Sequence, residues 1–282
     1  MLSWIDGVAG NQIAVVDRGL QYGDGLFETM MVRDGRIRFL QAHLDRLTDG
    51  AKRLGLLPCN RLQLAAEWQA GAMQLGTGAL KALLTRGDAM VRGYAPPLNA
   101  IPRRILLGYH EALGVPPEPA AVWCCAMQLS ENPVLAGMKT LNRLEQVLAC
   151  AEWQQAARSL SLNLREGLLR SVNRTFVSGT AANLFWRTGS VLHTPPLDRC
   201  GIAGVIRSVV LRDVNHLGLT VTQSPAQLQD LLDADEVFLT NVRWPVLPVG
   251  SLHYDDGRKQ RDWDMSAACA RQLTTWLAGM NE

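Results

Sequence analysis

The sequence predicts an α/β (α+β) protein of two domains, and three observations support this. The 282 residues are enough for two domains or one large α/β unit, and 48% of them are hydrophobic, so a sizeable core can form. Expected strands and helices are interspersed along both halves of the chain. The proline-rich stretch 111–120 predicts a linker between a domain over residues 1–110 and a domain over residues 121–282.

The first domain is predicted to be small and α/β in character. Apolar runs predict strands over residues 12–16, 25–32, 36–40, 78–85 and 103–108. Asp34-Gly35 between two of these runs is typical of a hairpin turn. Helical periodicity predicts helices over residues 40–54 and 61–75. The glycine-, arginine- and proline-rich residues 86–97 predict a loop.

The second domain is predicted to be larger. Its expected strands cover residues 121–129, 162–172, 174–177, 183–194 and 236–240, the fourth folded over Thr188-Gly189. One helix is expected to begin near Asn142, and three more are expected over residues 203–216, 226–232 and 263–280.

Charge and cysteine content exclude several classes of protein. The 28 basic and 26 acidic residues give a net charge of +2 without any block of like charge, so we expect no nucleic-acid partner. The N-terminus lacks the order of a signal peptide, and no apolar run reaches membrane-spanning length. Six scattered cysteines form no C-x-x-C pair, and no histidines stand at zinc-site spacing. The sequence therefore predicts a cytoplasmic enzyme with free thiols and no metal site or membrane partner.

Lys139 is the strongest candidate for a reactive side chain. It follows the apolar residues 133–137 and precedes a helical repeat of apolar residues at Leu144, Val147, Leu148 and Ala151. A lysine at the mouth of a helix, among small and apolar residues, is a candidate for a desolvated amine that acts as a nucleophile or forms a Schiff base. An ordinary solvated lysine is the more common alternative for such a residue on its own.

Three longer motifs resemble a known family. They are D-R-G-L-Q-Y-G-D-G-L-F-E-T over residues 17–29, R-G-Y over 92–94 and L-A-G-M-K-T-L-N-R-L-E-Q-V-L over 135–148. With them the chain resembles the fold-type IV pyridoxal-phosphate (PLP) enzymes over nearly its whole length. This family includes branched-chain and D-amino-acid aminotransferases and 4-amino-4-deoxychorismate lyases, and the similarity is greatest to the lyases. The resemblance implies a larger C-terminal domain with a β-barrel-like sheet and flanking helices, and a homodimer.

The resemblance also implies which residues bind PLP. Lys139 matches the lysine that forms the Schiff base, and Arg46 matches an arginine that binds the phosphate. Residues 201–207 match a phosphate-binding turn, in which the backbone N–H groups of Val205 and Ile206 lie at a helix N-terminus. Thr240 and Asn241 match the last phosphate contact. Arg207 is expected to be an ordinary solvated helix residue.

Substrate contacts are implied by the glycine-rich motifs. Aminodeoxychorismate carries two carboxylates, and Arg92 matches one clamp, with the hydroxyl of Tyr94 as a further donor. Tyr22 and Phe27 are expected to form pocket walls. Glu28 is at least as compatible with a structural as with a catalytic role.

Ser178 departs from the family pattern. The family carries V-x-E-G-x-x-x-N, whose carboxylate pairs with the protonated pyridine nitrogen of PLP, but residues 176–183 here read F-V-S-G-T-A-A-N, with Ser178 in the place of the glutamate. No acidic residue lies between Glu166 and Asp198, so a small error of register cannot supply one. A serine hydroxyl can donate to a neutral nitrogen, and the ring then withdraws electrons less strongly. Transamination should suffer more than β-elimination.

The expected function is therefore the PLP-dependent β-elimination of pyruvate from 4-amino-4-deoxychorismate, which gives 4-aminobenzoate for folate synthesis. Lys139 would act as the base, and either Lys139 or Thr29 would protonate the leaving oxygen. Two alternatives remain open at this point. One is an aminotransferase of the same fold, and the other is a diverged PLP-binding paralogue with weak or no lyase activity because of Ser178.

Overall fold

The computed structural model describes residues 1–90, 92–111, 118–254, 258–263 and 268–280. The chain divides into two compact units, Met1–Leu113 with Met138–Asn142, and Gly114–Gly137 with Arg143–Met280. The predicted linker at 111–120 stays a prediction, because residues 112–117 lie outside the described residues. The short segment around Lys139 groups with the first unit, although the sequence placed it in the second domain.

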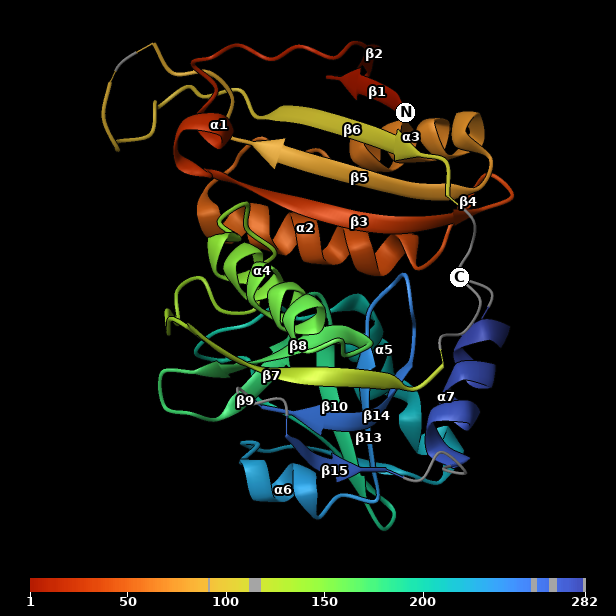
Figure 1. Ribbon diagram of the computed structural model, residues 1–282. Helices are drawn as coiled ribbons and strands as arrows, with labels where there is room; N and C mark the ends of the chain where they lie inside the picture. The colour runs from red at the N-terminus through yellow and green to blue at the C-terminus, as the bar shows by residue number, and fades with distance from the viewer. Residues whose placement is uncertain (91, 112–117, 255–257, 264–267, 281–282) are drawn as a thin grey trace. The chain divides into compact units, whose positions relative to one another are not determined.

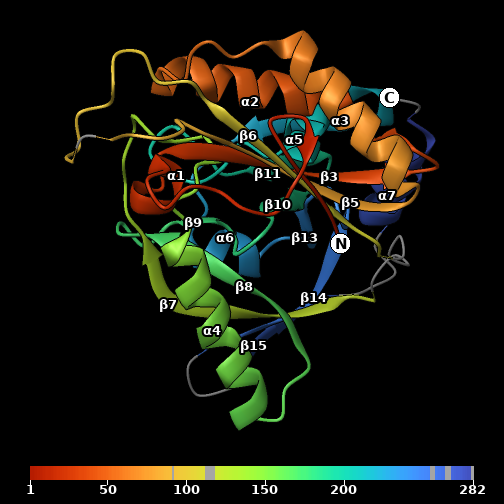
Figure 2. The same ribbon diagram turned by 90° about the horizontal axis from the view of Figure 1, so that it is seen from above.

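A six-stranded sheet forms the first unit, in the order β2-β1-β6-β5-β3-β4. Its strands are β1 (Leu2–Ile5), β2 (Val8–Ala9), β3 (Gly25–Arg33), β4 (Arg36–Ile37), β5 (Gly78–Thr85) and β6 (Arg103–Tyr109). Its helices are α1 (Arg18–Tyr22), α2 (Leu40–Leu54) and α3 (Arg61–Leu75). Helices α2 and α3 pack side by side on one face of this sheet (Figures 1 and 2).

Local sequence explains most of these elements. The β3–β4 hairpin turns at Asp34 and Gly35, which both have positive φ, as the predicted Asp-Gly turn requires. Helix α2 buries Leu44, Leu47 and Ala51 at helical spacing. These predictions are confirmed.

The predicted strand over residues 12–16 is wrong. Residues 12–15 are exposed, Val15 at 78%, and they pair with no described strand. The N-terminal strand is instead β1, which pairs antiparallel with β6. The apolar run at 12–16 has no neighbouring strand to pair with among the described residues and no buried face, and a strand needs both.

A nine-stranded sheet forms the second unit, and six of its strands close into a barrel. The sheet runs β12-β11-β10-β13-β14-β7-β8-β9, and β9 also pairs with β10, so that β10, β13, β14, β7, β8 and β9 form a ring. The strands are β7 (Ala120–Leu129), β8 (Leu164–Ser171), β9 (Phe176–Gly179), β10 (Asn183–Thr188), β11 (Val191–Thr194), β12 (Thr220–Gln223), β13 (Glu236–Thr240), β14 (Leu247–His253) and β15 (Lys259–Asp262). The helices are α4 (Leu144–Ser159), α5 (Val205–Asp213), α6 (Leu228–Leu232) and α7 (Ala268–Gly279), with a 3₁₀ helix at Val214–Leu217.

Strand β7 has a continuous apolar run over residues 120–127. Val122 and Cys124 project into one buried cluster, whereas Trp123 and Cys125 project into a second cluster that packs against α4. Because neighbouring residues of a strand point to opposite faces, a strand buried on both faces reads as a continuous apolar run.

Several boundaries differ from those predicted. The strand expected at 174–177 lies at Phe176–Gly179, because Arg174 has positive φ and turns the chain. The last helix begins at Ala268 among the described residues, and Trp263 precedes it outside any helix. The remaining part of that prediction, residues 264–267, lies outside the described residues.

Candidate functional site

Lys139 is held by strand pairing in the first unit and does not lie at the start of a helix. Phe27 N donates to Lys139 O at 2.9 Å, and Leu141 N donates to Gly25 O at 3.0 Å. The segment thus lies along the beginning of β3, and the Lys139 Nζ sits 4.1 Å from the centre of the Phe27 ring. Helix α4 begins only at Leu144, so the predicted helix-mouth position is wrong. In the observed position, two backbone hydrogen bonds to β3 hold the segment.

A buried cluster of three charged or titratable side chains connects β3 with α2. Arg46 Nε donates to Glu28 Oε1 at 2.7 Å, and His43 Nδ1 lies 2.6 Å from Glu28 Oε2. Burial alone would raise the pKa of Glu28, but the charge of Arg46 and hydrogen bonds from His43 and Arg46 lower it to about 2. Glu28 therefore stays ionised and fixes the side chain of Arg46, the predicted phosphate ligand.

His43 is a neutral imidazole in this cluster. Burial lowers its pKa, and Glu28 only partly opposes the shift. An ionised carboxylate only accepts hydrogen bonds, so Nδ1 carries the proton and donates to Glu28. The His43 Nε2 is buried and has no hydrogen-bond partner among the described residues.

Thr29, the second predicted catalytic residue, lies on β3 two residues after Phe27. Alternate residues of a strand project to the same face, so Thr29 and Phe27 share the face on which the Lys139 amine lies. Glu28 projects to the opposite face, toward α2. This arrangement is compatible with an acid role for Thr29, which stays a prediction.

The predicted phosphate turn leads into helix α5 in the second unit. Its N-cap residue, Gly204, provides no side chain to bond the first N–H groups of the helix, so those of Val205 and Ile206 remain available as anion donors. A Cβ atom at Gly204 would lie 2.0 Å from Asn183 Oδ1, so only glycine fits there. Asn183 Nδ2 donates to Ile202 O at 2.8 Å and holds the turn in place.

Three predicted or neighbouring site residues form one row across β9, β10 and β13. Ser178 pairs with Asn183, and Asn183 pairs with Thr240. Directly paired positions project to the same face, and adjacent strands lie about 4.8 Å apart, so Ser178 and Thr240 are roughly 10 Å from each other. The hydroxyl oxygen of Thr240 is buried and lacks a hydrogen-bond partner among the described residues. Such an orphaned buried hydroxyl is unfavourable unless a ligand supplies its partner.

Asn241 differs from Thr240 because its side chain already has partners. Its Oδ1 accepts from Trp244 N at 2.6 Å, and its Nδ2 donates to Ala181 O at 3.4 Å. It shapes the turn after β13. Its predicted contact with phosphate stays a prediction.

Glu166 does not replace the missing carboxylate at Ser178. A Cβ atom at Gly179 would lie 3.2 Å from Glu166 Cγ, so Glu166 is on the face of β9 to which Gly179 points. Ser178 precedes Gly179 on the same strand and points to the other face. Burial raises the pKa of Glu166, and its carboxyl group is bonded by Thr180 and by the N–H of Gly167. Its role is to hold the β8–β9 region.

Arg207 is not a solvated helix residue. It is 5% exposed, and its guanidinium donates to Pro195 O at 2.9 Å and to Gln223 Oε1 at 2.8 Å. Burial lowers its pKa to about 10. The sequence prediction was wrong because α5 is buried on the face that carries Arg207 as well as on its apolar face.

Two of the predicted substrate contacts lie together in the first unit. The rings of Tyr22 and Tyr94 meet edge to face with their centres 5.6 Å apart. Arg92 and Tyr94 are exposed, Tyr94 at 85%. Phe27, a predicted pocket wall, has its ring beside the Lys139 amine. The contacts of Arg92, Tyr94 and Tyr22 with a substrate stay predictions.

Comparison with known proteins decides the family. The family model described as amino-transferase class IV matches residues 25–252. The chain belongs to this family. It is 31% identical to an aminodeoxychorismate lyase of Vibrio harveyi over 88% of this chain and 90% of that protein. It is 26% identical to a D-alanine aminotransferase of Bacillus licheniformis over 85% of this chain and 83% of that protein.

A solved class IV structure agrees with the fold. The crystal structure of 4-amino-4-deoxychorismate lyase from Pseudomonas aeruginosa matches with a TM-score of 0.86 and 39% identity, and 98% of each chain is covered. The fold-type IV architecture predicted from the sequence is confirmed. No described helix is both long and apolar enough to cross a membrane.

Sequence reasoning missed two residues that support predicted site residues, one in each unit. Asn183 holds the phosphate turn, and it was present in the motif as the final N of V-x-E-G-x-x-x-N, without an assigned role. His43 is the buried neighbour of Glu28, and only the spacing H-L-D-R in α2 hinted that it shares a face with Arg46.

Proposed function

We propose that this chain is a PLP-dependent lyase that converts 4-amino-4-deoxychorismate to 4-aminobenzoate and pyruvate. Its similarity to two proteins named as this lyase, over nearly the whole of each chain, is the observation that carries the proposal. The same similarity supports a role for the 4-aminobenzoate product in folate synthesis.

The described residues fit PLP. The orphaned hydroxyl of Thr240 and the uncapped N-terminus of α5 match the needs of a phosphate group, which accepts several hydrogen bonds. Arg46 adds a fixed cation. Ser178 lies in the same row as Thr240 and would face the ring nitrogen. Asn241, Val205 and Ile206 complete the proposed set, with Lys139 as the covalent attachment.

PLP supplies an aldehyde that condenses with amines and a ring that withdraws electrons from the carbon bearing the amine. The chain supplies the proton transfers. Lys139 Nζ would take the proton from that carbon, and the C–O bond to the enolpyruvyl group would then break. The leaving oxygen would receive a proton from Lys139 or from the hydroxyl of Thr29. Arg92 and Tyr94 would bind the substrate carboxylates, and Tyr22 and Phe27 would line the pocket.

The direct test is turnover by the purified protein loaded with PLP. Aminodeoxychorismate should yield pyruvate, measured with lactate dehydrogenase, and an equal amount of 4-aminobenzoate, measured by fluorescence. Lys139→Ala should abolish both products and the long-wavelength absorbance of bound PLP. Lys52→Ala, at the exposed end of α2, is the control and should behave as the wild type. Wild-type protein that releases neither product would refute the proposal.

An aminotransferase is the second candidate, because a D-alanine aminotransferase is 26% identical over most of the chain. Ser178 argues against it, since transamination needs a stronger electron sink than this elimination. Formation of pyridoxamine phosphate from an amino acid, without 4-aminobenzoate formation from aminodeoxychorismate, would favour it. A bound chromophore with no turnover would favour the silent paralogue.

We further propose that the enzyme is cytoplasmic and a homodimer. Six cysteines free of disulfides, all within the described residues, support a reducing compartment. Helix α4 supports self-association, because Leu144, Val147 and Leu148 are exposed at 69%, 59% and 50% on adjoining positions of one face.

A further inference from the structure

Arg18 is a buried arginine that no step of the proposed reaction uses. It is 3% exposed and lies in the first turn of α1. Its Nε donates to Asp24 Oδ2 at 2.9 Å, its Nη1 donates to Gly93 O at 3.1 Å, and its Nη2 donates to Tyr94 O at 2.8 Å. All three guanidinium nitrogens are thus bonded, two of them to successive carbonyl groups of the loop predicted over residues 86–97. This loop carries the R-G-Y motif and is called the R-G-Y loop below.

The same guanidinium also lies over the ring of Tyr22, 4.8 Å from its centre. Tyr22 in turn meets the ring of Tyr94 edge to face. Arg18 therefore binds the loop by its backbone and, through Tyr22, adjoins the side chain of Tyr94.

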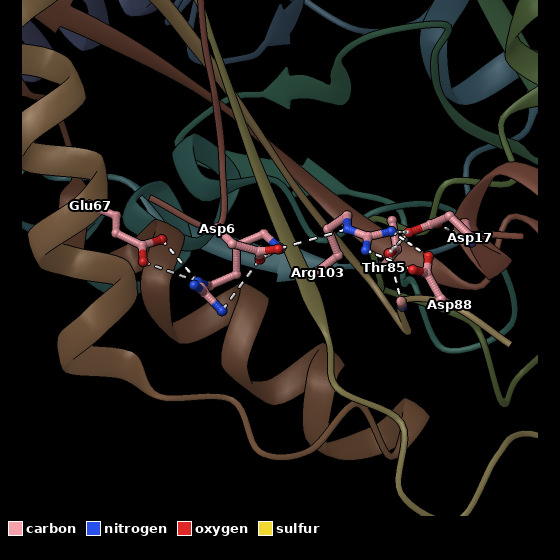
Figure 3. A network of polar contacts seen from close by, with 9 residues as sticks. Asp6, Asp17, Glu67, Thr85, Asp88 and Arg103 are labelled. Carbon is pink, nitrogen blue, oxygen red and sulfur yellow. Dashed lines mark hydrogen bonds and ion pairs between the residues drawn. The ribbon is translucent and has the colours of Figure 1, made fainter. Parts of the chain in front are cut away.

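Helix α1 is firmly anchored and can serve as a fixed support. Asp17 Oδ1 accepts from Gly19 N at 2.8 Å, and Asp17 Oδ2 accepts from both Thr85 and Arg103 at 2.9 Å (Figure 3). Figure 3 shows how Arg103 also reaches Asp88, so that this network ties α1 to β5 and β6. On the other side of Arg18, Asp24 accepts from Arg86 Nε at 2.6 Å.

The R-G-Y loop has little packing of its own. Met90, Tyr94 and Leu98 are exposed at 87%, 85% and 102%. Apolar side chains so exposed contribute little to fixing a loop, so the loop depends on its backbone hydrogen bonds. The two that Arg18 donates are directed at the residues immediately after Arg92.

We propose that Arg18 is a positioning residue for substrate binding. It holds the Gly93 and Tyr94 carbonyl groups against α1 and so places the side chains of Arg92 and Tyr94 where they meet the substrate carboxylates. The proposal rests on the proposed function, in which Arg92 and Tyr94 bind those carboxylates. Arginine is required because its planar fork bonds three acceptors at once, whereas a lysine amine is a single point charge.

The first arm of the test measures the loop itself and does not depend on any activity. In the PLP-loaded protein, Arg18→Lys should speed hydrogen–deuterium exchange in peptides covering residues 86–101. Arg104→Lys is the matched control, because Arg104 is a half-buried arginine of the same unit whose carboxylate partners are Glu67 and Asp6. Unchanged exchange in Arg18→Lys would overturn the proposal.

The second arm measures kinetics with aminodeoxychorismate. Arg18→Lys should raise KM at least about tenfold, as expected for loss of one or two charge-assisted hydrogen bonds, with kcat within about threefold and PLP absorbance unchanged. The effect should largely vanish in an Arg92→Ala background, because the two residues act through one contact. Additive effects, or a parallel fall in kcat and bound PLP, would show a merely structural role and overturn it.

A second variant, in the loop itself, tests the same proposal if Arg18→Lys folds poorly. Gly93 has φ of +126° with open space around it, so Gly93→Ala strains the backbone that Arg18 binds without a clash in the core. It should raise KM in the same way. Gly189→Ala, also at positive φ in open space, is the control and should not. Wild-type protein without turnover would refute the proposed function, whereas active wild type with unaltered KM in both variants would refute only the role of Arg18.

Discussion

Ser178 is the residue whose chemistry most distinguishes this chain from the family pattern. Ser178→Glu would place a carboxylate in the row that contains Thr240 and restore charge pairing with a protonated ring nitrogen. We expect the ratio of transamination to elimination to rise several-fold, measured as pyridoxamine phosphate against 4-aminobenzoate. Ser178→Ala, which removes the hydroxyl without adding charge, should leave that ratio low. An unchanged product ratio and PLP spectrum in Ser178→Glu would show that this position does not face the ring nitrogen.

Glu28 makes a specific prediction about acid stability. Its pKa is about 2 in the folded chain and about 4.5 when unfolded, so the unfolded state binds one more proton between these values. Stability from Glu28 is complete above pH 4.5 and is lost as the pH falls toward 2, at up to about 1.4 kcal/mol per pH unit. The lowered pKa of buried His43 acts in the same direction and begins near its ordinary value of 6.5.

The comparison of Glu28→Gln with the wild type isolates this effect. At pH 7 the variant should be less stable by roughly 3 kcal/mol, because Arg46 loses its buried partner. Urea denaturation at pH 7, 4 and 3 should show this difference shrinking below pH 4.5. A difference that stays constant down to pH 3 would contradict the low pKa of Glu28.

The roles of single residues were predictable where a motif limits which residue types can do the chemistry. They were less predictable where contacts with distant segments determine the position of a side chain. Lys139 and Arg46 could be proposed from motifs, but the strand pairing that fixes Lys139 needs β3, which lies more than 100 residues earlier. The burial of Arg207 has the same origin, because its acceptors, Pro195 and Gln223, come from separate segments. Long-range partners of this kind leave no local signal in one sequence.

At the scale of elements, the end of β13 should reveal whether a phosphate binds. Thr240→Val removes a buried hydroxyl that has no described partner, so the PLP-free protein should be equally stable or gain about 1 kcal/mol. The dissociation constant for PLP should rise about 10- to 100-fold, since a hydrogen bond to a charged group is lost. Thermal melts of the PLP-free protein and absorbance titrations with PLP measure the two effects.

Thr194→Val is the matched control for this prediction. Its hydroxyl is equally buried but has partners within the chain, because it donates to Leu184 O at 2.8 Å and accepts from Arg207 Nε at 3.4 Å. This variant should lose about 1 kcal/mol of stability and keep its affinity for PLP. If Thr240→Val instead behaved like Thr194→Val, the hydroxyl of Thr240 would have no role in binding.

The elements themselves were predictable where local sequence signals mark them. Helices α2 and α3 and strand β5 were found with their bounds, and strand β3 to within one residue. Strand β14 was missed because Pro248 and Gly250 interrupt it, and β15 because all four of its residues are polar and exposed. These two strands form only because neighbouring strands offer backbone partners. Tertiary context, rather than propensity, decides them.

At the scale of the whole molecule, the apolar face of α4 leads to a prediction about assembly. Leu144, Val147 and Leu148 belong to the apolar helical repeat seen in the sequence, yet they are at least half exposed. A second copy of the chain is the occupant that the family resemblance favours. Sedimentation should therefore find a dimer, and Leu144→Glu with Leu148→Glu should weaken it by at least about tenfold, because two apolar anchors are replaced by like charges. Val172→Glu, at a turn position that is 53% exposed, should leave the dimer intact.

A monomeric wild type, or a double variant that dimerises as tightly as the wild type, would show that α4 is not the interface. Because the substitutions alter surface positions only, a loss of dimer with unchanged far-UV circular dichroism would assign the effect to assembly and not to folding.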